Sequence, residues 1–268
     1  MRRTRTIAYG FLLTIAVLAS ACKKVIDVDL KNATPQIVIE GNITDAGGPY
    51  EVKITKTVDF PADNVFPPVT NATVFVTDST NGITEELIQA DSGIYLTTDF
   101  LGVPHHTYGI VVNVDGQRYT ASSRMPARVP LDSITFAENV NFNNQTEINA
   151  VVNFQDPKGL GNYYMFTEYV NGRQIPNIFV FEDRLSDGRY IQDPLFNDSA
   201  YLQKNDTLVI TMDCIDQNIY NYFYTLMNVT GNNNFQSVTP ANPVSNLSNG
   251  ALGYFSAHTR QRATISVY

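Results

Sequence analysis

The densest group of charged side chains in the sequence lies in one short stretch, residues 181–189. Its charged members are Glu182, Asp183, Arg184, Asp187 and Arg189. Paired carboxylates can work as a general acid and base, and several together can ligate Ca²⁺. The spacing does not match the EF-hand loop, however. We therefore predict a solvated loop in which the two arginines balance the acids, and we treat these five residues as a candidate binding loop without a metal.

The histidines and serines do not suggest a reactive centre. His105 and His106 are adjacent, so in an extended chain their side chains face opposite ways, and His258 is far away in the sequence. A zinc site normally needs three or four ligands at known spacings. Ser256 stands two residues before His258 but lacks the strand–elbow–helix context of a serine nucleophile. We predict no metal, no cofactor and no catalytic activity.

The N-terminus reads as an export signal. A basic start with Arg2, Arg3 and Arg5 precedes the 12-residue apolar stretch Ile7–Leu18, and Ala-Ser-Ala then leads to Cys22. The apolar stretch is too short to span a membrane, which takes roughly 20 residues. The pattern resembles a bacterial lipobox, although Ala19 stands where Leu is commonest. We predict a signal peptide over residues 1–21 and a lipidated tether over 22–36 that anchors the chain through Cys22. The alternative is an ordinary secretory signal that happens to precede a cysteine.

The chain has only two cysteines, Cys22 and Cys214. Lipidation would consume the first, so no internal disulfide is expected. Cys214 stands near the start of an expected helix, where a thiol pKa can fall, but Asp213 and Asp216 would oppose that shift. We predict that Cys214 is a buried, structural residue.

Composition limits the class of protein. The chain has 268 residues, 43% of them hydrophobic, and a formal net charge of −8. These values exclude a disordered or collagen-like chain, and the length favours two domains. An acidic chain without a basic run lacks the electrostatic footprint of a nucleic-acid binder. We therefore expect no nucleic-acid partner.

The first half shows period-two alternation of apolar residues in short runs that are separated by Gly, Pro, Asn and Asp. The runs are 37–44, 50–57, 72–77, 86–89, 93–98, 108–114 and 117–122. Asp115-Gly116 between the last two is a strong hairpin signal. We predict an antiparallel β-sandwich over residues 37–124, followed by an extended, proline-containing connector.

The second half, residues 131–268, is predicted to be a further β-sandwich with one packed helix at about 215–229. Asp213 is the expected N-cap of this helix. Its aromatic residues, Tyr220, Tyr222, Phe223 and Tyr224, cover more than one face, so part of them either contacts a sheet or forms an exposed binding surface. The absence of Trp disfavours a carbohydrate platform, although Tyr also stacks on sugars. The predicted fold class is mainly β, with two tandem β-sandwich domains.

Several segments together resemble a known family. They are the lipobox, residues 37–44, 49–57, 69–74 and 116–121, and the stretch 246–255 with its sequence Asn-Leu-Ser-Asn-Gly-Ala-Leu-Gly-Tyr-Phe. Their order is similar to that of Bacteroidota lipoproteins of the domain-of-unknown-function family 4249. The resemblance implies an outer-membrane lipoprotein encoded beside a TonB-dependent receptor barrel. It also implies a first domain like transthyretin or carboxypeptidase-regulatory sandwiches. It supplies no catalytic residues.

Four positions follow an Asp in a pattern that resembles the O-glycosylation acceptors of exported Bacteroidota proteins. They are Ser79, Ser133, Ser199 and Thr207. The pattern is short, and it also arises by chance in a chain rich in Asp, Ser and Thr.

The sequence leads us to expect a non-catalytic, lipid-anchored outer-membrane protein. We expect it to act as an accessory or ligand-capture partner of a TonB-dependent uptake barrel. The alternative is a stand-alone cell-surface adhesin or glycan-binding lipoprotein, and a hydrolase that uses loop carboxylates is a third possibility. The tether sequence does not decide whether the anchored protein faces the periplasm or the cell surface, and we favour the cell surface.

Overall fold

The computed structural model describes residues 34–58, 65–140, 144, 146–197, 202–230 and 242–268. From Pro35 onward these residues belong to one compact unit. The predicted signal peptide and most of the tether, Cys22 included, lie outside the described residues. The described chain is mainly β-structure with a single α-helix and one short 3₁₀ helix, which confirms the predicted fold class. No helix among the described residues is both long and apolar enough to cross a membrane.

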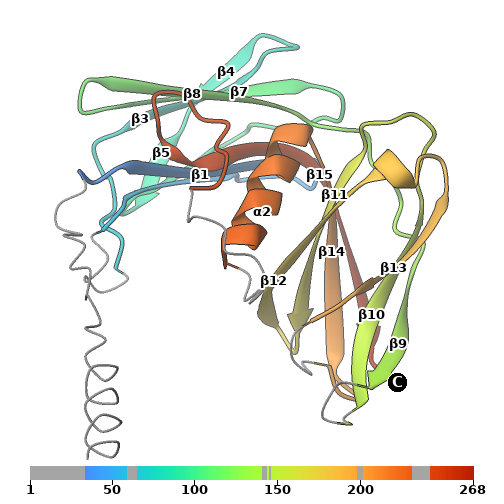
Figure 1. The fold of residues 1–268 in the computed structure, drawn as a ribbon. Helices are drawn as coiled ribbons and strands as arrows, with labels where there is room; N and C mark the ends of the chain where they lie inside the picture. Colours follow the sequence, from blue (N-terminus) through green and yellow to red (C-terminus); the bar gives the residue numbers. More distant parts are fainter. Residues whose placement is uncertain (1–33, 59–64, 141–143, 145, 198–201, 231–241) are drawn as a thin grey trace, which may run out of the picture. The chain divides into compact units, whose positions relative to one another are not determined.

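The strands form three sheets (Figure 1). In the first half the elements are β1 (Ile37–Thr44), β2 (Glu51–Lys56), β3 (Thr73–Asp78), β4 (Ile83–Glu86), β5 (Ile88–Asp91), β6 (Ile94–Leu96), β7 (Thr107–Val114) and β8 (Gln117–Arg124). In the second half they are β9 (Ser133–Val140), β10 (Thr146–Gln155), β11 (Tyr163–Val170), β12 (Arg173–Glu182), η1 (Asp183–Leu185), β13 (Tyr190–Leu195), β14 (Thr207–Ile215), α2 (Gln217–Thr230) and β15 (Leu252–Ser266).

The N-terminal sandwich packs the four-stranded sheet β4-β3-β7-β8 against the end of the eight-stranded sheet that contains β1, β2, β5 and β6. Alternation builds it, because every second residue of β7, from Tyr108 to Val114, is buried. Asp115 and Gly116 both have positive φ in the turn to β8, so the predicted hairpin is confirmed. The predicted run 86–89 is divided between β4 and β5 at the buried residue Leu87.

The C-terminal sandwich packs the three-stranded sheet β13-β10-β9 against the other end of the large sheet, β12-β11-β14-β15. Phe154 of β10 meets Tyr164 and Phe166 of β11 between the two layers, with ring centroids 4.8 and 5.9 Å apart. The apolar side chains of β14, such as Ile210 and Met212, complete this core.

The last strand belongs to both sandwiches. β15 pairs in parallel with β1 from Leu252 to His258 and then antiparallel with β14 from Thr259 to Ser266. Phe255 and Ala257 consequently lie in the core of the N-terminal sandwich. The boundary over residues 124–131 stays a prediction, and the structure adds that the C-terminal segment is shared across it.

The helix α2 lies on the large sheet, against β11, β12 and β15 (Figure 1). Its apolar residues Ile219 and Phe223 pack on Met165 and Ile215. The prediction that Asp213 is its N-cap is wrong, because β14 continues through Ile215 and holds Asp213 in the sheet. Asp216 is the cap, since its Oδ1 accepts the N–H of Ile219 at 3.0 Å.

Candidate functional site

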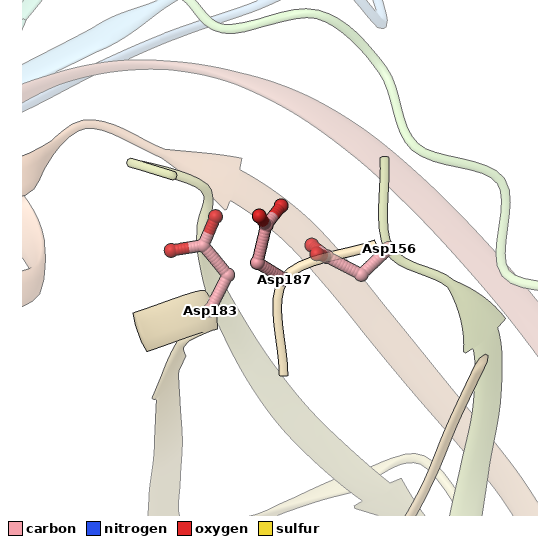
Figure 2. Close-up of side chains that lie close together, drawn as sticks. All are labelled: Asp156, Asp183 and Asp187. Carbon is pink, nitrogen blue, oxygen red and sulfur yellow. The ribbon is translucent and has the colours of Figure 1, made fainter. Parts of the chain in front are cut away.

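The candidate binding loop forms one side of a three-carboxylate cluster (Figure 2). Asp183 begins η1 and Asp187 follows it, whereas Asp156 comes from the turn after β10. One oxygen of each carboxylate lies within 4.8 Å of the others. The structure thus joins two loops, residues 156–162 and 183–188, through acidic side chains.

Asp183 is a buried member of this cluster, not solvated as predicted. Its Oδ1 accepts the backbone N–H of Gly161 at 3.0 Å. Its Oδ2 accepts the backbone N–H of Asn162 at 3.0 Å and the side-chain amide of Asn162 at 2.9 Å. Hydrogen bonds to a charged acceptor are among the stronger ones in proteins. Asp183 therefore fixes the 156–162 loop onto the end of β12.

The other two carboxylates fasten the same loops from opposite directions. Asp156 accepts the phenol O–H of Tyr164 with one oxygen and the N–H of Gly188, at 3.0 Å, with the other. Asp187 accepts the N–H of Gly159 at 2.6 Å. Burial and the bond to Asp156 raise the pKa of Tyr164, so this phenol remains a donor.

The hydrogen-bond donors around the carboxylates decide between a calcium site and a structural role for the cluster. Calcium takes about six to eight oxygen ligands, whereas Asp156 and Asp183 already receive hydrogen bonds from the protein on both of their oxygens. The arrangement is that of a hydrogen-bonded clamp, and it holds the surface residues of η1 in place.

The residues that this clamp presents outward are Arg184 and Leu185. Arg184 forms an ion pair with Glu182, and its side chain is 73% exposed. Leu185 is 88% exposed. Arg189, also in the candidate loop, is exposed as well. Arg184 balances Glu182 as predicted, whereas Asp183 is bound by the backbone N–H groups of Gly161 and Asn162 and by the side-chain amide of Asn162.

A stack of three tyrosines lies beside this loop. The ring of Tyr220 on α2 is 5.1 Å from that of Tyr163 on β11 and 5.7 Å from that of Tyr224, to which it is nearly parallel. Glu182 and Arg184 act electrostatically on Tyr163 and Tyr220, and burial together with Glu182 raises the pKa of both phenols. The candidate binding loop therefore lies near the Tyr163 and Tyr220 rings of this stack.

Residues 23–264, nearly the whole chain, match the family described as Domain of unknown function (DUF4249). The chain belongs to this family. A search of curated proteins finds no match. The family description names no activity, so the chemistry of this DUF4249 protein has to be argued from its own residues.

The histidines and Cys214 take structural positions in this DUF4249 chain. His106 Nδ1 lies 2.7 Å from Oδ2 of the buried Asp78. His258 Nδ1 lies 2.9 Å from the hydroxyl of Ser256, and its Nε2 is 3.6 Å from Asp213. Ser256, His258 and Asp213 are all at most 1% exposed, so the group is enclosed between strands. Cys214 is buried as predicted.

Three of the four possible O-glycosylation positions lie in described parts of the chain. Ser79, Ser133 and Thr207 are exposed, whereas Ser199 lies outside the described residues. Glycosylation of any of them stays a prediction.

Sequence reasoning missed Asp156 and Asn162 as members of the site. The stretch Asp156-Pro157-Lys158-Gly159 is a recognisable turn signal. The local sequence pattern does not reveal the pairing of β10 with β13. This pairing brings Gln155 opposite Tyr190 and so places the loops 156–162 and 183–188 side by side.

Proposed function

We propose that this protein is a Bacteroidota outer-membrane lipoprotein that serves as an accessory, ligand-capture partner of a TonB-dependent uptake barrel. The observation that carries the proposal is Cys22, which directly follows a basic start, a 12-residue apolar stretch and Ala-Ser-Ala. Membership in the DUF4249 family supports it, as does the resemblance of the sequence segments named above to Bacteroidota lipoproteins.

The anchor gives the proposal a physical mechanism. Several acyl chains on one cysteine hold a protein on a membrane lastingly, whereas a single chain does so only marginally. A tethered protein meets its neighbours at a high effective concentration, so weak contacts are sufficient for function. The exposed residues Arg184 and Leu185 are a suitable contact, because Arg is enriched where proteins bind partners.

The anchoring step is tested with Cys22→Ser. In the native host we expect the parent protein in the outer-membrane fraction and the variant in the soluble fraction of the envelope. A variant that remains membrane-bound in the same proportion would contradict lipidation at this residue.

The partnership is tested by capturing the full chain, tagged at its C-terminus, from native outer membrane in mild detergent. We expect one barrel protein in near-equal amount by mass spectrometry. The double variant Arg184→Ser, Leu185→Ser should lose that barrel. A control that changes the exposed residues Ile83 and Arg173 to Ser should retain it. Recovery of the protein without any barrel would contradict the proposal.

A further inference from the structure

The solvent-facing side of α2 is polar but carries no charge. The helix spans Gln217–Thr230, and none of its residues is Asp, Glu, Lys or Arg. Its exposed side chains are Gln217, Asn218, Asn221, Tyr224, Asn228 and Val229. A surface helix usually carries charged residues on the face opposite its apolar stripe. Here amides and a phenol take the place of charged side chains, so this face can form hydrogen bonds without carrying a charge, although the whole chain has a net charge of −8.

The amides and the tyrosine form one continuous stripe. Residues 217, 221, 224 and 228 follow each other at intervals of four, three and four, which places neighbours along one side of a helix. Tyr224 therefore lies between Asn221 and Asn228. Tyr224 is exposed, with 51% of the residue accessible to solvent, and its ring stacks on the ring of Tyr220. The stack holds the Tyr224 ring in position and leaves part of it accessible to a ligand.

A charged pair, Arg184 and Glu182, lies near the end of the stack that includes Tyr224. Arg184 on η1 lies within electrostatic range of Tyr220 and Tyr163, and Glu182 binds its guanidinium. Because the carboxylate neutralises the guanidinium, this pair adds hydrogen-bond donors and acceptors without a net charge. The loop that carries Arg184 is fixed by Asp183, so the pair is preorganised.

We propose that this α2 stripe, Gln217, Asn221, Tyr224 and Asn228, binds a neutral oligosaccharide. The proposal rests on the proposed function and names the class of its cargo. An aromatic ring presents an apolar face to the C–H face of a pyranose, and a side-chain amide both donates to and accepts from neighbouring hydroxyl groups. A neutral ligand leaves no unpaired charge on binding, and the acidic protein would repel an anionic polysaccharide.

The charge-free stripe also weighs against other occupants. A nucleic acid requires Lys or Arg along its contact surface. A tight protein interface has an apolar centre, whereas here the amides surround a single tyrosine. The acidic cluster of Asp156, Asp183 and Asp187 is directed into the clamp by its hydrogen bonds and is not part of the proposed ligand site.

The test uses the full-length protein in mild detergent and isothermal titration calorimetry. The probes are maltohexaose, cellohexaose, xylohexaose and mannohexaose, with hexagalacturonate as the anionic counterpart. We expect at least one neutral hexasaccharide to bind and hexagalacturonate not to bind. Tyr224→Ala should weaken the binding by about tenfold or more, because it removes the accessible ring. Tyr224→Phe should retain most of the affinity, since it keeps the ring.

The matched control is Tyr190→Ala on β13, because Tyr190 is 50% exposed. This variant should bind like the parent protein. Absence of binding by all four neutral probes, equal weakening by Tyr190→Ala, or unchanged binding by Tyr224→Ala would overturn the proposal. Barrel capture is measured on the same samples. A captured barrel without sugar binding rejects the carbohydrate cargo and leaves the partnership, whereas sugar binding without a barrel supports the site and rejects the partnership.

Discussion

Ser123 and Asp216 connect the N-terminal sandwich to the helix of the C-terminal one. The hydroxyl of Ser123 on β8 donates to Asp216 Oδ2 at 2.6 Å, and it accepts the backbone N–H of Ala257 on β15 at 2.8 Å. The other carboxylate oxygen of Asp216 caps α2. One acidic residue thus joins β8, the shared strand and the helix that carries the tyrosine stack.

Replacing this aspartate should destabilise the protein and loosen α2. We expect Asp216→Ala to lower the free energy of unfolding by about 2 kcal/mol, because it removes a helix cap and leaves the buried Ser123 hydroxyl and the Arg124 N–H without their acceptor. Asp216→Asn keeps one oxygen, which still accepts the N–H of Ile219, but puts an NH2 in place of the oxygen that accepts from Ser123 and Arg124, so it should cost less than Asp216→Ala. Urea unfolding followed by circular dichroism measures both values. Equal stability of the two variants would contradict the double role.

The parallel pairing of β15 with β1 depends on Gly253, which lies opposite Ile39. A Cβ added at this residue would lie 2.1 Å from the carbonyl oxygen of Ile39, and the φ angle of +90° is itself unfavourable for other residues. We expect Gly253→Val to expose the amides of β1 and β2 to hydrogen exchange before those of β11 and β12. Gly250→Ala is the control, because Gly250 also has a positive φ but has no atom within 4 Å of its Cβ position. Loss of protection in both variants alike would reject the packing explanation.

The clamp at the candidate site should depend more on its buried carboxylates, Asp156 and Asp183, than on the exposed Asp187. Asp183→Ala leaves the N–H groups of Gly161 and Asn162 without an acceptor, so we expect a loss of about 2 to 3 kcal/mol in the free energy of unfolding. Asp187→Ala removes one bond at an exposed residue and should cost less than about 1 kcal/mol. Thermal unfolding of the two variants compares them directly. A larger effect of Asp187→Ala would mean that the cluster has another role than that of a clamp.

Alternation predicted the strands that have one buried face. β1 and β7 lie where the period-two pattern placed them. β12 and β13 were not anticipated, and each contains a proline, Pro176 and Pro194, which argues against a strand. Both strands lie at a sheet edge, where proline is tolerated.

The shared strand β15 could not be derived from local pattern. Only residues 263–267 alternate clearly, whereas the stretch from Phe255 to Thr259 is buried on both sides and has no alternation. Its partner β1 is at the other end of the chain, so the pairing is set by tertiary contacts. For the same reason the sequence predicted the candidate binding loop but not the contribution of Asp156, because Asp156 is brought to this loop by the pairing of β10 with β13.

The buried His258 should make the protein less stable in acid. Burial is the main cause that lowers its pKa from 6.5 to about 4, and Asp213, Arg260 and Asp45 are the charged groups that act on it. The unfolded chain therefore takes up a proton below pH 6.5 that the folded chain refuses until about pH 4. The contribution of His258 to the free energy of unfolding, which is complete above pH 6.5, is therefore lost as the pH falls to 4, by about 3 kcal/mol at most.

The measurement is the difference in free energy of unfolding between the parent and His258→Gln at several pH values. This difference cancels the contributions of all other groups. We expect it to shift in favour of the variant as the pH falls from 6.5 to 4, with little change between pH 7 and 8. A difference that is constant with pH would show that His258 is protonated in the folded protein as readily as in the unfolded chain.

Glu168 should have the opposite pH dependence. Its side chain points into the apolar core of the C-terminal sandwich, where Oε2 accepts the amide of Asn197 at 2.8 Å and Oε1 has no partner among the described residues. Burial raises its pKa from 4.5 to about 6, against the opposing effect of Asn197. The folded chain therefore holds a proton that the unfolded chain releases, and this stabilisation is complete below pH 4.5 and lost as the pH rises through 6.

Replacing the carboxylate with the neutral amide separates this effect from the cost of altering the core. The free energy of unfolding of Glu168→Gln, minus that of the parent protein, should be larger at pH 7.5 than at pH 4.5, by about 2 kcal/mol at most. Glu138→Gln on β9 is the control, because it makes the same change at an exposed residue. A flat difference for Glu168→Gln would mean that the buried carboxylate ionises as easily in the folded protein as in the unfolded chain, which requires a cationic partner for Oε1.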